Sequence, residues 1–183
     1  MKATVTKAPW VNDDLTPESL AALELIDGSW REACSRFVTM SQIKVSAGKS
    51  APKGIQFFLN EVLTERFVEA GWDADDSRFR LNSTWVRVTF RHQMSLGSDL
   101  LDAVRLSSMG GVTQCLILAA GNEFLRIITP SDAMAICSAE KFVSQVARLN
   151  GAISAPIFIG ELAPSSKLST PVSDFVFGTR LRR

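Results

Sequence analysis

The chain has 183 residues, of which 46% are hydrophobic and 21% are charged, and its formal net charge is +1 at pH 7. This composition is typical of a globular protein with one domain and a sizeable core, and it excludes a disordered chain. The near-neutral balance also excludes a protein that coats DNA through charge alone.

The first residues predict an irregular arm followed by a helix. Residues 1–14 show no periodicity and are expected to be irregular. LTPESLAALELIDG, residues 15–28, predicts a helix with Thr16 as its N-cap, Pro17 at its first position and Gly28 past its end. We therefore expect the first helix to stop at Gly28.

The next segment is less regular. Residues 29–40 are compatible with either a helix or a strand. Residues 41–54 are rich in Gly, Ser, Lys and Pro and predict a loop, either mobile or a contact loop that carries lysines. We expect residues 1–53 to form a helical arm with a loop, and residues 54–183 to form the core of one compact domain.

The middle of the chain alternates helices and strands. Residues 54–72 predict a helix, with Gly71 as its stop and a line of glutamates, Glu61, Glu65 and Glu69, on its exposed face. A turn at residues 73–78 precedes two strands on either side of Asn82-Ser83, and residues 95–111 predict the next helix.

The last third continues this alternation. Residues 112–120 predict a buried strand, and residues 122–129 a second strand after a hairpin turn at Gly121-Asn122. Residues 138–151 predict a helix, and residues 154–162 and 172–183 predict strands. The expected class is α/β, with a central mixed sheet flanked by helices.

Cysteine and histidine usage bounds the chemistry. Cys34, Cys115 and Cys137 form no CxxC pair, and a single histidine is present, so a structural zinc site is excluded. Free thiols in a reducing compartment are the favoured interpretation. The start of the chain has no secretory signal pattern, and no apolar run is long enough to span a bilayer. We expect a cytoplasmic protein.

The basic residues are concentrated in the second part of the chain. Residues 1–76 hold 8 basic and 12 acidic side chains, whereas residues 77–183 hold 12 basic and 7 acidic ones. Ten of these twelve basic residues are arginines, which bind phosphates and carboxylates through two parallel hydrogen bonds. This distribution permits a surface that faces a polyanion.

The stretch STWVRVTFRHQ, residues 83–93, has the alternation of a strand with one buried face. Its other face carries Arg87, Thr89 and Arg91, and the lone His92 follows. No motif for phosphate binding, for a serine nucleophile or for a metalloprotease is present. A histidine at a strand end without such a motif is interpreted as an edge residue.

The order of elements between residues 54 and 162 resembles restriction endonucleases of the PD-(D/E)xK superfamily, in particular the BglII-like branch. The resemblance is carried by Gly71-Trp72 at a helix end, by the strand pair RFRLNSTWVRVTF, by Asp99-Leu100-Leu101 and by the apolar strand that begins at Val112. It implies a nuclease fold in which carboxylates of the strand pair and an ExE or ExK motif bind Mg²⁺.

The chain departs from this pattern at the acids. Arg87-Val88-Thr89 occupies the ExE or ExK slot, and the upstream acid falls near Arg78 or Phe79. A guanidinium in place of a carboxylate repels Mg²⁺, so we expect no metal and no cofactor. Arg87 and Arg91 then either pair with acids such as Glu61 or Glu65 or contact nucleic acid.

Three functions remain open. The first is a catalytically inactive nuclease-fold protein that binds DNA or a partner in a DNA-handling or phage-defence system. Its expected nucleic-acid contacts are Arg78, Arg80, Arg87, Arg91, Lys44, Lys49 and Lys53, with the tail arginines Arg180, Arg182 and Arg183. The second is a protein-interaction or homodimeric subunit that does not bind nucleic acid, which the many Phe and Trp residues favour.

The third function is an active Mg²⁺-dependent endonuclease with displaced carboxylates. Its candidate catalytic residues are Asp76, Asp99, Glu61 and His92. A solvated turn is the competing interpretation of the DADD segment that contains Asp76, and an N-cap is the competing interpretation of Asp99.

Overall fold

A computed structural model describes residues 1–150, 152–164, 172 and 175–176 of the chain. Its centre is a six-stranded mixed sheet with the order β1-β6-β5-β4-β3-β2. The strands β4, β5 and β6 are parallel, and the remaining strands pair antiparallel at both sides. The strands are β1 (Lys2–Lys7), β2 (Asp73–Asp75), β3 (Arg78–Leu81), β4 (Thr84–Thr89), β5 (Gln114–Ala120) and β6 (Ile157–Ala163).

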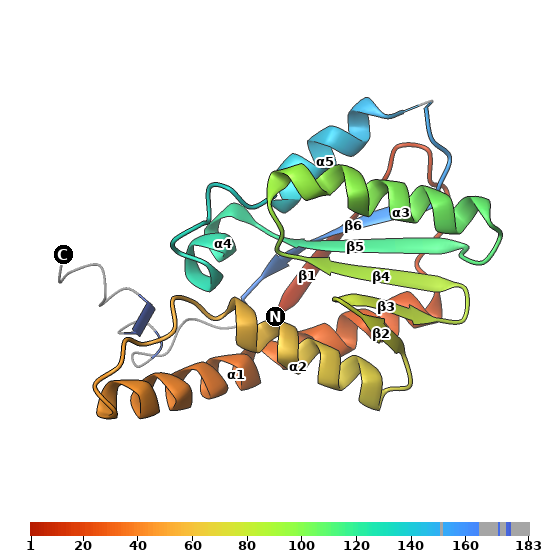
Figure 1. Ribbon diagram of the computed structural model, residues 1–183. Helices are drawn as coiled ribbons and strands as arrows, with labels where there is room; N and C mark the ends of the chain where they lie inside the picture. The colour runs from red at the N-terminus through yellow and green to blue at the C-terminus, as the bar shows by residue number, and fades with distance from the viewer. Residues whose placement is uncertain (151, 165–171, 173–174, 177–183) are drawn as a thin grey trace.

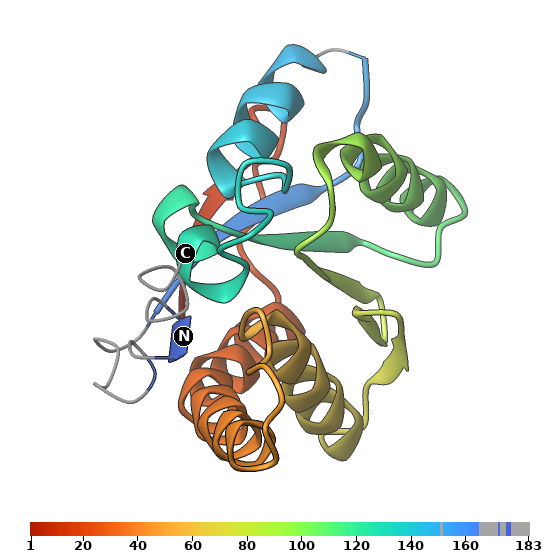
Figure 2. The same cartoon turned by 60° about the vertical axis from the view of Figure 1, so that its left-hand side comes forward.

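Helices cover both faces of this sheet (Figures 1 and 2). One face carries α1 and α2, and the other carries α3 and α5, while α4 lies at one end. The helices are α1 (Pro17–Ser46), α2 (Gln56–Glu69), η1 (Gln93–Ser95), α3 (Leu96–Ser108), α4 (Asn122–Ile128) and α5 (Ala139–Arg148). The expected α/β class, with a central mixed sheet flanked by helices, is confirmed.

The double covering explains the apolar central strands. Every residue of β4 and β5 is buried, because helices pack on both faces of these strands. The sequence predicted only one buried face for residues 83–93, which is wrong for β4. Arg87 and Thr89 point to a face that α3 covers rather than to solvent.

The irregular arm expected at residues 1–14 is wrong, because Lys2–Lys7 form β1. This strand pairs antiparallel with β6 along its whole length, from Lys2 opposite Ala163 to Lys7 opposite Phe158. An edge strand that alternates exposed and half-buried side chains carries little hydrophobic signal of its own. It forms a strand because the backbone of β6 has an unpaired side with which β1 can form hydrogen bonds.

The first helix does not stop at Gly28. Thr16 caps it as predicted, with its side chain accepting a hydrogen bond from the Ser19 N–H at 3.2 Å, but α1 continues to Ser46. Gly28 lies inside the helix, and the Arg66 guanidinium of α2 lies against it in the space that a Cβ would occupy. The ambiguous residues 29–40 are helical.

The loop expected at residues 41–54 is correspondingly shorter. Lys44 lies in the last turn of α1, and only the residues after Ser46, including Lys49 and Lys53, connect α1 to α2. The polar composition predicted the connection correctly but placed its start too early.

The hairpin expected at Gly121-Asn122 is also wrong. Residues 122–128 form α4, whose first turn begins directly after β5. The run NEFLRII is short and apolar, and such runs have no decisive periodicity. Tertiary packing selects the helix, in which Phe124, Leu125 and Ile128 are buried.

The turn expected at residues 73–78 is wrong for its first half, because Asp73–Asp75 form β2 and only Asp76 and Ser77 make the turn to β3. The other predicted elements up to residue 162 are present, with ends that shift by a few residues. The strand expected at residues 172–183 falls mostly outside the described residues, and its three described positions, 172 and 175–176, are helical. Arg180, Arg182 and Arg183 lie outside the described residues. Within the described part of the chain, no helix is long and apolar enough to cross a membrane.

Candidate functional site: a buried arginine between two aspartates

Arg87 lies in the middle of β4, and its side chain is only 1% exposed. A guanidinium removed from water requires both a counter-charge and hydrogen-bond acceptors. Here β4 supplies the arginine, and two other elements supply its partners. The first is α3, and the second is the turn between β2 and β3.

The partner from α3 is Asp99, which is also 1% exposed. Arg87 Nε donates a hydrogen bond to Asp99 Oδ1 at 3.1 Å. Asp99 lies in the first turn of α3, where a negative charge also interacts favourably with the helix dipole. The N-cap position of this helix is Ser95, so the N-cap interpretation of Asp99 is wrong.

The partner from the turn is Asp76. Arg87 donates a hydrogen bond through Nη1 to the Asp76 carbonyl oxygen, and its Nη2 lies 3.8 Å from Asp76 Oδ2. Asp76 and Ser77 both have positive φ, at 43° and 60°, as in a two-residue hairpin turn. The turn therefore places a backbone acceptor and a carboxylate on the same guanidinium.

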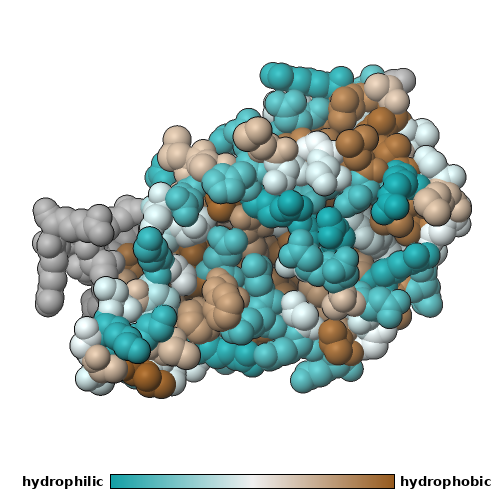
Figure 3. All heavy atoms as spheres, viewed as in Figure 1, coloured by the Kyte–Doolittle hydropathy of each residue, from teal (hydrophilic) through white to brown (hydrophobic). Residues whose placement is uncertain are grey.

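Further arginines and aspartates surround Arg87 and its two aspartate partners. Arg78 Nη2 lies 3.2 Å from Asp102 Oδ2, and Arg91 Nη1 lies 3.8 Å from Asp99 Oδ1. We call the whole group the Arg87 cluster: it comprises Arg78, Arg87, Arg91, Arg105, Asp75, Asp76, Asp99 and Asp102. Figure 3 shows hydrophilic side chains gathered between α3 and the β2–β3 hairpin.

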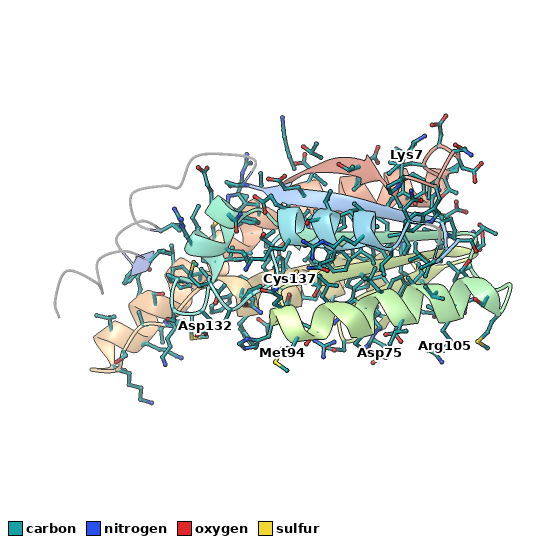
Figure 4. The ribbon with its side chains drawn as sticks, turned by 90° about the horizontal axis from the view of Figure 1, so that it is seen from above. Lys7, Asp75, Met94, Arg105, Asp132 and Cys137 are labelled. Atoms are coloured by element: carbon teal, nitrogen blue, oxygen red, sulfur yellow. The ribbon has the colours of Figure 1, made fainter. Side chains whose placement is uncertain are left out.

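The outer members of the cluster are more exposed than Arg87. Asp75 on β2 and Arg105 on α3 are 87% and 67% exposed, and both are labelled in Figure 4. Ion pairs at such exposed positions contribute little to stability. Within the cluster, loss of one partner of the buried pair Arg87 and Asp99 should therefore change the free energy of unfolding most.

Burial lowers the pKa of the Arg87 guanidinium, and the nearby positive charges of Arg78 and Arg91 act in the same direction. Asp99 and Asp76 oppose this shift. An arginine pKa starts far above neutrality, so the group stays protonated. Arg87 therefore contributes a permanent positive charge between two carboxylates.

The positions at which the resemblance implies acids lie opposite each other. Arg78 on β3 and Arg87 on β4 are register partners in the antiparallel pair. Both positions carry guanidinium groups here. Two guanidinium groups thus lie where the resemblance implies carboxylates, and the aspartates of the cluster balance their charge.

The predicted acidic partners of Arg87 and Arg91, Glu61 and Glu65, are wrong. Glu65 Oε2 instead binds Arg36 Nη2 at 2.6 Å, between α2 and α1, and this pairing holds the pKa of Glu65 below its usual range. Both arginines face α3 rather than α2. The acid that does bind Arg87 is Asp99, which lies twelve residues later in the chain, on α3.

The candidate catalytic residues of the endonuclease alternative do not all come together. Asp76 and Asp99 meet, with Arg87 between them, whereas Glu61 is exposed on α2. His92 is exposed just after β4 and forms an isolated bridge with Ile136. Over residues 1–150 and 152–164, no group of three or more His, Cys, Asp or Glu side chains is arranged to hold a metal ion.

The other predicted nucleic-acid contacts divide into two sets. Arg80 is exposed and donates a hydrogen bond to the Gly111 carbonyl oxygen at 2.8 Å, and Arg91 is 42% exposed. The three lysines, Lys44, Lys49 and Lys53, lie apart from the arginines, around the connection from α1 to α2. No ion pair within the described residues involves these lysines.

Sequence reasoning did not assign Asp102 as a partner of Arg78. The signal was present, because Asp99 and Asp102 are three residues apart and share one face of a helix. What was missing was the orientation of that face toward β3 and β4. Only the packing of α3 on the sheet supplies it.

The mixed sheet, its helical layers and the placement of the strand pair beside α3 define a restriction endonuclease-like fold. The chain is similar to the restriction endonuclease BglII, solved in complex with a DNA 16-mer, with a TM-score of 0.61. The match covers 88% of this chain and 76% of that chain at 15% sequence identity, so the likeness is one of fold. No protein-family model and no curated protein sequence matches the chain.

Proposed function

We propose that this protein is a catalytically inactive nuclease-fold protein that acts by binding DNA, in a DNA-handling or phage-defence system of the cytoplasm. The observation that carries the proposal is the buried Arg87 at a position where the resemblance implies a metal-binding acid. Its guanidinium contacts both Asp99 and Asp76, so these carboxylates are already engaged and are not free to bind a divalent cation. The proposed function therefore needs no Mg²⁺ and no other cofactor.

DNA is favoured as the partner by two further observations. The similar structure is that of a nuclease with bound DNA. In addition, Lys44, Lys49 and Lys53 lie close together without an ion pair among the described residues, so their charges are available to phosphates. Arg80 and Arg91 add exposed guanidinium groups near the strand pair.

The first test is fluorescence anisotropy of a labelled DNA duplex at low and near-physiological salt, with and without Mg²⁺. We expect binding that weakens steeply with salt and does not require the metal, because phosphate contacts release counterions. Replacing Lys44, Lys49 and Lys53 by alanine should reduce the slope of log K against log salt by about one for each phosphate that the variant no longer neutralises.

The matched control is Lys2→Ala, which removes an exposed lysine from β1 at another place in the sheet. This variant should bind like the parent protein. Binding that is absent, or that does not change with salt, would contradict DNA binding. Cleavage of plasmid DNA with Mg²⁺ or Mn²⁺ that is lost in Asp76→Ala or Asp99→Ala would instead establish the active endonuclease.

A protein-interaction or homodimeric subunit is the second candidate, and the outer side of α3 favours it. Met94, Leu101 and Met109 are 96%, 70% and 74% exposed, and Figure 4 shows Met94 beside the start of α3. Met94 belongs to η1, Leu101 to α3 and Met109 follows the last residue of α3, and exposed apolar side chains in such a series favour an interface. Under this candidate, light scattering gives a dimer mass that Leu101→Glu converts to a monomer.

The control for that experiment is Leu20→Glu, which changes a 50% exposed leucine on α1. It should leave the mass unchanged. A monomer mass for the parent protein at high concentration would exclude the homodimer, and a dimer without DNA affinity would favour this candidate over DNA binding.

A further inference from the structure

A groove of about 630 Å³ lies between the end of α1, the start of α2 and the segment that follows α4. Its volume is within the range of sites that hold small molecules. Met40 and Lys44 line it from α1, Phe57 and Asn60 from α2, and Asp132 from the segment after α4. Figure 4 places Asp132 beside the end of α1, separate from the Arg87 cluster.

One part of the groove favours an anion. Lys44 and Lys53 both line it, and neither forms an ion pair with any described residue. The N-terminus of α2 opens there as well, and among the described residues no side chain caps it. Lysines beside a helix N-terminus attract phosphate groups. Asp132 is the only acidic side chain among the lining residues.

Another part of the groove favours a planar ring. The Phe57 side chain is 64% exposed although it is aromatic, and it lines the groove together with Lys44 and Lys53. An exposed aromatic ring beside lysines can stack on a base whose phosphate the lysines bind.

We infer that this groove binds one unpaired nucleotide of a DNA strand. The base stacks on Phe57, and its phosphate lies near Lys44 and Lys53. The inference rests on the DNA binding proposed above, because a strand offers phosphates to Lys49 and its neighbours in addition to the one phosphate in the groove. Unpaired bases stack well on aromatic side chains, whatever their identity.

The test compares a blunt duplex with the same duplex carrying a short single-stranded overhang that contains 2-aminopurine. We expect the overhang to tighten binding by about ten-fold through one stacked base, and the 2-aminopurine fluorescence to change on binding. Phe57→Ala should abolish both effects and leave the affinity for the blunt duplex unchanged. Phe57→Trp should retain both effects.

The matched control is Leu20→Ala, another exposed apolar side chain, which lies near the start of α1 and does not line the groove. It should behave like the parent protein. If the blunt duplex binds but the overhang adds nothing, or adds the same in Phe57→Ala, the nucleotide groove is refuted and DNA binding stands. If neither duplex binds, the proposed function fails. Free dAMP that competes as strongly as the overhang would overturn the assignment to a strand.

Discussion

Arg87 combines features that a folded protein rarely tolerates: a charged side chain, a central strand and almost complete burial. Its hydrogen bond to Asp99 and its contacts with the Asp76 turn compensate for the lost hydration. Such a buried pair is not in itself strongly stabilising, because desolvation of both ions offsets their attraction. Removal of one partner alone, however, leaves the other charge uncompensated.

Arg87→Ala should therefore destabilise the protein by about 3–5 kcal/mol, because the buried Asp99 loses its hydrogen-bonded counter-charge and keeps only the half-exposed Arg91 at 3.8 Å. The measurement is the free energy of unfolding from urea denaturation. Arg105→Ala is the matched control, since Arg105 is 67% exposed and its loss should cost less than about 1 kcal/mol.

The double variant Arg87→Met with Asp99→Leu separates charge from packing. It removes both ions and keeps apolar volume, so it should recover most of the stability lost in Arg87→Ala. If the double variant is as unstable as the single one, the charge interpretation is wrong and the hydrogen bond from Arg87 to the Asp76 carbonyl oxygen matters instead.

At the scale of elements, two glycines lie inside a helix or a strand, next to a side chain of a neighbouring element. Gly28 lies inside α1 next to Arg66, and Gly160 lies in β6 next to its register neighbour Leu118 on β5. In both cases a Cβ would collide with the neighbouring side chain. A glycine in the sequence indicates a helix end or a turn by default, and only the neighbouring element reveals the other reason.

Gly160→Ala should destabilise the protein by about 1–3 kcal/mol, because the new Cβ must displace the buried Leu118 side chain within the sheet. Thermal or urea unfolding measures the change. Gly97→Ala is the matched control: it meets no atom within 4 Å and lies inside α3, so it should stabilise the helix by about 0.5–1 kcal/mol. Equal effects of the two changes would contradict the close-packing argument.

For the whole molecule, the burial of three free thiols makes the free energy of unfolding depend on pH. Burial raises the pKa of Cys34 and of Cys115 to about 12, and that of Cys137 to about 11, from an ordinary value of 9.0. A thiol with a raised pKa in the folded state keeps its proton where the unfolded chain loses it. Its contribution to stability is therefore complete below pH 9 and is lost as the pH rises toward 11.

We expect the free energy of unfolding to fall by about 1–3 kcal/mol per pH unit above pH 9. Urea denaturation between pH 8 and pH 10 tests this. The variant Cys115→Ala with Cys137→Ala should show a flatter dependence. An identical slope in parent and variant would assign the pH effect to other groups.

The sequence by itself determined the α/β class, most of the elements between residues 54 and 162, the Thr16 cap and the guanidinium groups of Arg78 and Arg87 on the strand pair. These features depend on local propensity, on hydrophobic periodicity and on residue identity, all of which can be recognised within a short window. Even the likeness of fold followed from the order of the elements.

Only the tertiary structure decided what each ambiguous segment became and which charges met. Lys2–Lys7 form a strand because β6 has an edge to pair with, and residues 122–128 form a helix because their apolar face is buried. Asp99 binds Arg87 because α3 packs its acidic face onto β4. Pairing partners, burial and grooves arise where distant segments meet, and no local pattern contains that information.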